Sequence, residues 1–352
     1  MRQAIEDKQM LCYLTALSLT LSVIESSLPH ALPFLRLGLA NLALLYALER
    51  LSTGDYFLLA FFKWLLSSLL SGLLFSPFSL VSLAGNAASA VLMLVLYRTL
   101  AGRLISLYSV SALGSAASGI CQLAASSLFL SSAVMRLTPL MLVFNLASGL
   151  ILAFVCCHVK TPENVMIETK AATGKDGGSS LVYLLYFAGF IALLANRSLI
   201  MLAVSFVIAL LLCMKTGRKI RLHFYILSFI FILIFNLLVP SGRVLFSFVT
   251  EEALRLGTER ALRLCAAVAL SQSLAGISMP QAGFIAGVLA VYGRLNDFFF
   301  SQRGKLMQKI KATLAVNHFE WKEHEAGKTG TKAAVLAVLI LILLSSVSFF
   351  IA

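Results

Sequence analysis

Six polar side chains interrupt stretches of sequence that are otherwise apolar enough to lie in a membrane. They comprise one carboxylate, one guanidinium and four amides: Glu25, Arg36, Asn41, Asn86, Gln122 and Asn145. Ionisable groups are costly in lipid and tend to face a cavity or a partner. The chemistry that these residue types offer is hydrogen bonding to a small polar ligand. The alternative is hydrogen bonding between helices, worth about 0.6 kcal/mol per contact.

Three charged residues near these runs have structural interpretations of their own. Glu25 and Arg36 would lie near the outer ends of the first two runs, where pairing with each other is an alternative to binding a ligand. Lys63 lies inside the third apolar run. Because that run begins near Asp55 on the inner side, we expect the long side chain of Lys63 to extend toward the inner surface.

Sequence features of catalysis are scarce. The four aspartates are far apart, at Asp7, Asp55, Asp176 and Asp297, whereas a Mg²⁺–diphosphate enzyme needs clustered carboxylates to hold its metals. The GKT triplet at 327–329 lacks the earlier glycine of a P-loop, because position 322 is lysine. The segment HFEWKEHE at 318–325 is interpreted as a solvated helix face, with metal binding as the alternative. We therefore expect no catalytic residue, no metal and no cofactor in this chain.

Composition indicates the environment of these residues. Of the 352 residues, 60% are hydrophobic and only 12% are charged, against roughly 25% charged residues in soluble domains. Apolar runs approach the length of about 20 residues that crosses a bilayer, and helices satisfy the backbone in lipid. The sequence therefore predicts an all-α, multi-pass membrane protein. The net charge of +13 is attributed to cytoplasmic loops, not to nucleic-acid binding.

The apolar runs fall into two sets separated by a polar linker. The first set predicts six helices, at about 10–28, 35–51, 56–75, 78–97, 105–130 and 137–158. Residues 160–180 are polar and rich in glycine and serine toward their end, which is typical of a linker. The second set predicts helices at about 181–195, 198–214, 222–239, 250–276 and 333–352. Three domains follow: residues 1–159, the linker 160–180 and residues 181–352.

The segment 276–331 is predicted to be a cytoplasmic insert without a clean span. Its apolar part, 284–300, is interrupted by Arg294, Asn296 and Asp297, and its end is strongly basic. With the N-terminus inside and alternating spans, most of the 28 lysines and arginines fall on the cytoplasmic side. The expected location is a bacterial cytoplasmic membrane.

Four motifs in the first half resemble those of the Gx transporter family, also labelled heptaprenyl diphosphate synthase component I. They are LRLGLANLALLYAL (35–48), SLAGNAASAVLMLVL (82–96), GSAASGICQLAASSLFL (114–130) and LTPLMLVFNLASGLILAF (137–154). The family is similar to the six-helix substrate-binding (S) components of energy-coupling factor (ECF) transporters. The resemblance thus implies capture of a small molecule, vitamin-like or isoprenoid-related, near the outer face. The family's His-Asn pair falls on Ser118 and Gly119 here, while Gln122 is kept.

The second half resembles a short ECF transmembrane coupling (T) component. The segment VTEEALRLGTERALRLCAAVALSQS (249–273) is similar to one of its helices, and SQRGKLMQKIKATL (301–314) is similar to its coupling segment. In that family an X-Arg-Gly triplet contacts ATPase subunits, and the matching residues here are Gln302, Arg303 and Gly304. A second such triplet is not evident in this sequence.

These resemblances imply an uptake-transporter subunit that captures a small molecule and couples to separate ABC-type ATPases, which would use ATP and Mg²⁺. The family label gives a rival interpretation, a non-catalytic membrane accessory subunit of a polyprenyl diphosphate synthase in isoprenoid or quinone synthesis. A secondary carrier is a third alternative, which would need coupling carboxylates at mid-membrane. In the transporter interpretation the amides, Glu25 and Arg36 would contact the substrate.

Overall fold

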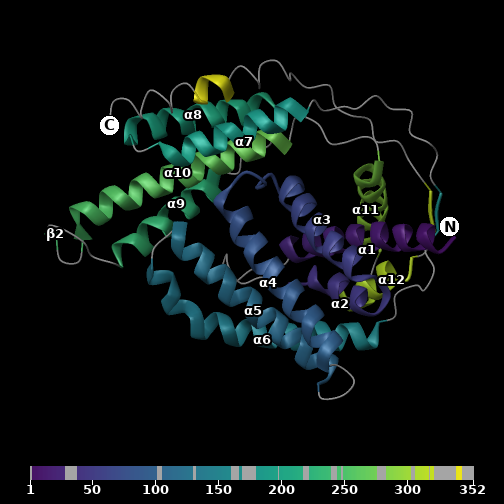
Figure 1. Ribbon diagram of the computed structural model, residues 1–352. Helices are drawn as coiled ribbons and strands as arrows, with labels where there is room; N and C mark the ends of the chain where they lie inside the picture. The colour runs from purple at the N-terminus through teal and green to yellow at the C-terminus, as the bar shows by residue number, and fades with distance from the viewer. Residues whose placement is uncertain are drawn as a thin grey trace.

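The molecule is an all-α protein (Figure 1). The structure is a computed structural model that describes residues 2–27, 38–100, 105–129, 132–159, 166–168, 180–196, 198–216, 222–238, 244–246, 249–275, 283–302, 306–316, 318–320 and 338–342. Two small pairs of strands accompany the helices in these ranges. They join β1 (Met166–Glu168) to β4 (His318–Glu320) in parallel, and β2 (Val244–Phe246) to β3 (Val249–Thr250) antiparallel.

The six helices predicted in the first half are present. They are α1 (Arg2–Ser27), α2 (Asn41–Arg50), α3 (Thr53–Ser71), α4 (Pro77–Leu100), α5 (Leu107–Phe129) and α6 (Thr138–His158), with the short 3-10 helix η1 (Ser132–Leu137) before α6. Local sequence sets the ends of α3, because Ser52 accepts a hydrogen bond from the Asp55 N–H at 3.2 Å and Gly72 ends the helix with φ of +70°.

The second helix is shorter than the sequence predicts. The apolar run predicts a continuous helix over 35–51, but the described helix begins at Asn41, after a turn in which Gly38 has φ of +70°. Its 10 residues extend roughly 15 Å at 1.5 Å per residue, about half of a bilayer core of about 30 Å. The prediction of a full span here was wrong, because a left-handed glycine interrupts the apolar run.

The second half contains six labelled helices in its described ranges, and residues 338–342, within the helix predicted at 333–352, are also helical. The labelled helices are α7 (Ser180–Ala195), α8 (Leu199–Lys215), α9 (Leu222–Leu237), α10 (Glu251–Ala275), α11 (Gly283–Ser301) and α12 (Leu306–Leu314). Residues 284–300 were predicted to form no clean membrane span, and they are not among the described helices that are long and apolar enough to cross a membrane. The stretch is one helix, α11, because its apolar residues fall on one face and bury Val288, Val291 and Leu295.

The helices form two groups that share a boundary (Figure 1). Helices α4, α5 and α6 pack side by side, and α10 packs against α7, α8 and α9. Helix α11 belongs to the second half of the sequence but packs against α1. The hydroxyl of Tyr13 on α1 also donates to the carbonyl oxygen of Leu314 at 3.0 Å. The end of the chain's second half is therefore part of the core of the first.

A second junction joins the end of α3 and the turn that follows it to α10. The N–H of Phe75 donates to the hydroxyl of Ser271 at 3.0 Å. A Cβ at Gly72 would lie 2.9 Å from the Cα of Gln272, so only glycine permits this approach. The two halves therefore contact each other through backbone and side chains at two separate places.

Three helical segments in the described ranges are long and apolar enough to cross a membrane. They are Pro77–Leu100, Leu107–Phe129 and Ser132–His158. Shorter apolar helices lie at Leu184–Ala195, Leu199–Lys215 and Tyr225–Leu237. Their composition and length are those of a helical membrane protein.

Candidate functional site: a polar cavity among the first six helices

A buried carboxylate holds the turn before α2. Glu25, near the end of α1, is only 5% exposed. Its Oε1 accepts a hydrogen bond from the N–H of Gly38 at 2.7 Å, and its Oε2 accepts one from the N–H of Leu39 at 3.0 Å. The carbonyl oxygen of Gly38 in turn accepts from the N–H of Asn41 at 2.7 Å. Glu25 thereby fixes the start of α2, while Arg36, its predicted partner, lies outside the described residues.

A buried lysine lies between two of the predicted amides. The Nζ of Lys63 on α3 donates to the Oδ1 of Asn41 on α2 and, at 3.0 Å, to the Oδ1 of Asn86 on α4. The Nδ2 of Asn86 donates to the carbonyl oxygen of Ala60 at 2.7 Å, which orients its amide oxygen toward the lysine. The expectation that Lys63 extends toward the membrane surface was wrong. The hydrogen bonds to two amide oxygens offset part of the free-energy cost of burying the charged Lys63 among the helices.

Two further amides come from α5 and α6. The Nε2 of Gln122 donates to the hydroxyl of Ser118, one turn earlier on α5, at 3.2 Å. The Nδ2 of Asn145 donates to the carbonyl oxygen of Met141, one turn earlier on α6, at 2.7 Å. Each amide is thus anchored to its own helix through the NH₂ group, which leaves the amide oxygen available to other donors.

Two glycines on neighbouring helices leave space for the side chains of Gln122 and Asn145. A Cβ added to Gly85 on α4 would overlap the side chain of Gln122, and a Cβ added to Gly119 on α5 would overlap the amide of Asn145. Small residues let neighbouring helices approach closely. Gly85 and Gly119 therefore serve the site directly, because they accommodate polar side chains from the next helix.

These side chains line one cavity, which we call the polar cavity. Its volume is about 110 Å³, and α1 to α6 all contribute to its wall. Ser115 on α5 also lines it. The Oγ of Ser115 is buried and has no hydrogen-bond partner among the described residues. A buried hydroxyl without a partner costs about 1–3 kcal/mol, so its position in this wall points to a group that would occupy the cavity.

The structure brings together five of the six predicted substrate-binding residues. Those that line the polar cavity are Glu25, Asn41, Asn86, Gln122 and Asn145. Lys63 and Ser115 also belong to the site, although neither was predicted from the sequence as a binding residue. A lysine in the middle of an apolar run is a signal for a site, whereas one serine among many in α5 gives no signal without the packing of its neighbours.

The predicted coupling triplet is only partly described. Gln302 follows the end of α11, and its N–H donates to the carbonyl oxygen of Phe298 at 3.3 Å. Arg303 and Gly304 lie outside the described residues. Their predicted contact with ATPase subunits stays a prediction.

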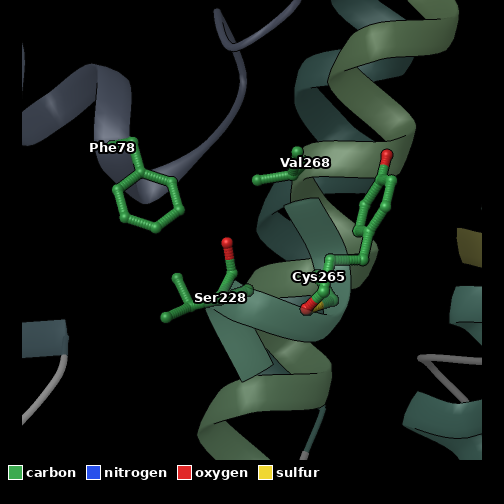
Figure 2. Close-up of a pocket in the computed structure, with 6 residues that line it drawn as sticks. Phe78, Ser228, Cys265 and Val268 are labelled. Carbon is green, nitrogen blue, oxygen red and sulfur yellow. The ribbon is translucent and has the colours of Figure 1, made fainter. Parts of the chain in front are cut away.

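A second hollow lies between α4 of the first half and α9 and α10 of the second, and it differs in kind. Figure 2 shows the ring of Phe78 on α4 facing Ser228 on α9 and Cys265 and Val268 on α10. Its volume is about 0 Å³, so the surrounding side chains already fill it. Within the described parts of the chain, no three His, Cys, Asp or Glu side chains gather at one place.

Comparisons with known proteins find a similarity for the first half. Residues 14–159 match the family model described as heptaprenyl diphosphate synthase component I, and residues 181–274 match a domain of unknown function (DUF8519). No curated protein and no solved structure matches the chain. The first match includes every residue that lines the polar cavity, on α1 to α6. The cavity-bearing half of this chain is therefore similar to heptaprenyl diphosphate synthase component I, as its motifs predicted.

Proposed function

We propose that this chain is the membrane subunit of an ATP-driven uptake system of the ECF type. The first half would capture a small polar solute in the polar cavity. The second half would couple that capture to ATPase subunits of the ABC type, which supply the ATP and Mg²⁺ chemistry. In this proposal the chain lies in a bacterial cytoplasmic membrane with its N-terminus inside.

The polar cavity is the observation that carries this proposal. Six helices contribute polar side chains to one space, and a buried lysine is among them. Polar and charged groups inside a helical membrane protein are costly and commonly mark a path or site for a solute. A helix bundle that served only as a scaffold would be more stable with apolar side chains at these positions.

The contacts between the halves support the coupling role. Helix α11, which ends just before the proposed ATPase-binding triplet, buries Val291 and Leu295 in the core that contains α1. An aromatic pair joins α11 to a neighbouring helix of the first half, with the ring centroids of Phe62 on α3 and Phe284 on α11 at 4.9 Å. A movement of the segment around Gln302 would therefore act directly on helices that line the cavity.

The first experiment tests capture. The full chain is purified in lipid nanodiscs, and small molecules that it retains are identified by mass spectrometry after denaturation. We expect a polar solute of low mass at a near-stoichiometric amount. The absence of any retained or binding solute, or retention of a prenyl lipid alone, would contradict the capture role.

The second experiment tests coupling. Arg303→Glu should abolish association with ATPase subunits, because it replaces the proposed charge-assisted donor with a carboxylate. Lys215→Glu, at an exposed site at the end of α8, is the matched control and should leave association unchanged. ATPase activity of the purified complex provides the readout, and equal activity in the Arg303 variant and the control would refute the docking role.

The family description supports a second candidate. The matched model is named for a synthase component, so an accessory role beside a polyprenyl diphosphate synthase is the alternative. Copurification of a soluble prenyl synthase with this chain, without an ATPase, would favour it. The small polar cavity favours solute capture, because an isoprenoid chain is long and apolar.

A further inference from the structure

The polar cavity contains two opposite charges that use different hydrogen-bond partners. Among the described residues in its wall, Lys63 and Glu25 are the only charged ones. Lys63 bonds to the amide oxygens of Asn41 and Asn86. Glu25 bonds to backbone N–H groups of the turn before α2. The wall is thus dipolar, with a cation on α3 and an anion on α1.

Both charged groups keep capacity for another partner. An ammonium has three N–H donors and a carboxylate has about four lone-pair positions. Two donors of Lys63 and two acceptor positions of Glu25 are used by the bonds above. The hydroxyl of Ser115 bonds to no group in the described part of the chain. The wall therefore still offers donors for an anionic group and acceptors for a cationic one.

Charge balance selects among the solutes that could use these groups. A lone anion would leave two negative charges against Lys63, and a lone cation would leave two positive charges against Glu25. Unbalanced buried charge is strongly unfavourable. A solute that carries both charges leaves the charges of the described wall balanced while it engages both ends of that wall.

The size of the cavity limits the solute further. A volume of about 110 Å³ exceeds the roughly 10–15 Å³ that a water needs and is smaller than the roughly 300 Å³ of sites for drug-sized ligands. We infer that the polar cavity binds a small zwitterion of the amino-acid class, about the size of glycine or alanine. The carboxylate of the solute would accept from Lys63 and Ser115, and its ammonium group would donate to Glu25. This inference rests on the proposed function and names its substrate class.

The test compares matched probes on the full chain in nanodiscs. Glycine, L-alanine, acetate, methylammonium and acetamide are titrated by calorimetry, after any retained solute has been removed by dialysis. We expect glycine or L-alanine to bind at least tenfold more tightly than acetate, methylammonium or acetamide, because only the zwitterions engage both charges. Acetate or acetamide binding as tightly as the zwitterions would overturn the inference.

Ser115→Ala keeps the test decisive if changes at the charged residues prevent folding. It removes only a hydroxyl that has no partner among the described residues, and it should weaken glycine or alanine binding about three- to tenfold. Ser127→Ala is the matched control on the same helix, because its hydroxyl lies outside the cavity wall and bonds to the carbonyl oxygen of Ala124 at 2.7 Å. Unchanged affinity in the Ser115 variant would count against the assigned contact.

The two proposals fail in different ways. If mass spectrometry identifies a retained solute of another class and the zwitterions do not bind, the amino-acid inference fails while the capture role stands. If no solute is retained and no probe binds, both fail.

Discussion

The two halves of the molecule use polar residues inside apolar helices in different ways. In the second half, α10 carries Arg260, which donates to the Oδ1 of Asn236 at 2.8 Å, and Arg263, which donates to the carbonyl oxygen of Asn196 at 2.7 Å and pairs with Glu259. In the first half, the polar groups surround a cavity.

The difference lies in packing and not in residue type. The hollow between α4, α9 and α10, which neither arginine lines, has a volume of about 0 Å³ (Figure 2), whereas the polar cavity has about 110 Å³. Polar side chains that satisfy one another across a filled interface hold helices together. The same residue types around an unfilled space form a site, so the comparison separates a structural use from a binding use.

Replacement of the buried cation should have the largest effect. Lys63→Met removes a charged donor from the cavity and should weaken binding of the retained solute about tenfold to hundredfold, at roughly 1.5–3 kcal/mol for a charged hydrogen bond. Calorimetry measures the affinity of each variant for the solute, on protein shown to be monodisperse. Arg263→Met in the second half is the matched change and should lower stability while leaving affinity intact. Equal losses of affinity in both variants would abolish the distinction between the halves.

A glycine-to-alanine substitution in the first half should disturb the polar cavity more than the same substitution in the second half. Gly119→Ala places a Cβ on the amide of Asn145, and the resulting displacement should cost about 1–3 kcal/mol and weaken binding. Gly189→Ala is the matched change in the second half, because it raises helix propensity by the same amount. Its Cβ would lie 3.1 Å from the Cγ1 of Val338, which is the end of a side chain outside the cavity wall. The measurement is the affinity of both variants for the solute. A larger loss of affinity in Gly189→Ala than in Gly119→Ala would contradict the prediction.

Two serine substitutions should have opposite consequences for stability, and Ser115→Ala should have the smallest effect on stability. Ser273→Ala removes the hydroxyl that bonds to the Tyr186 hydroxyl at 3.0 Å, and a buried hydroxyl left unpaired costs about 1–3 kcal/mol. Ser115→Ala removes a hydroxyl that lacks a partner in the described part of the chain, so the unliganded protein should be equally or slightly more stable. Thermal unfolding in nanodiscs measures both, and a large destabilisation by Ser115→Ala would show that its hydroxyl is already satisfied.

The sequence predicts the helices well because their apolar runs are long. The six helices of the first half are confirmed, and so are α7 to α10. An error arises where a local feature competes with composition, because a left-handed Gly38 shortens α2. The polar residues of α11 do not prevent a helix, because its apolar face is buried against α1.

The candidate site was predictable as a set of residue types but not as a geometry. Their place within apolar runs is enough to identify the amides Asn41, Asn86, Gln122 and Asn145, all of which line the cavity. Lys63 was missed because a long side chain can reach a membrane surface from many positions, and only the packing of α2 and α4 beside α3 shows that it remains inside. The unpartnered hydroxyl of Ser115 depends on distances between the described helices, which no sequence pattern encodes.

Occupancy of the polar cavity by a small polar solute is the central claim. The most direct measurement is mass spectrometry of molecules retained by the purified chain in nanodiscs, run in parallel on the wild-type protein and on Lys63→Met. We expect a low-mass polar solute bound to the wild-type protein and strongly depleted in the variant. A wild-type protein that retains nothing, or equal retention by both proteins, would contradict the claim.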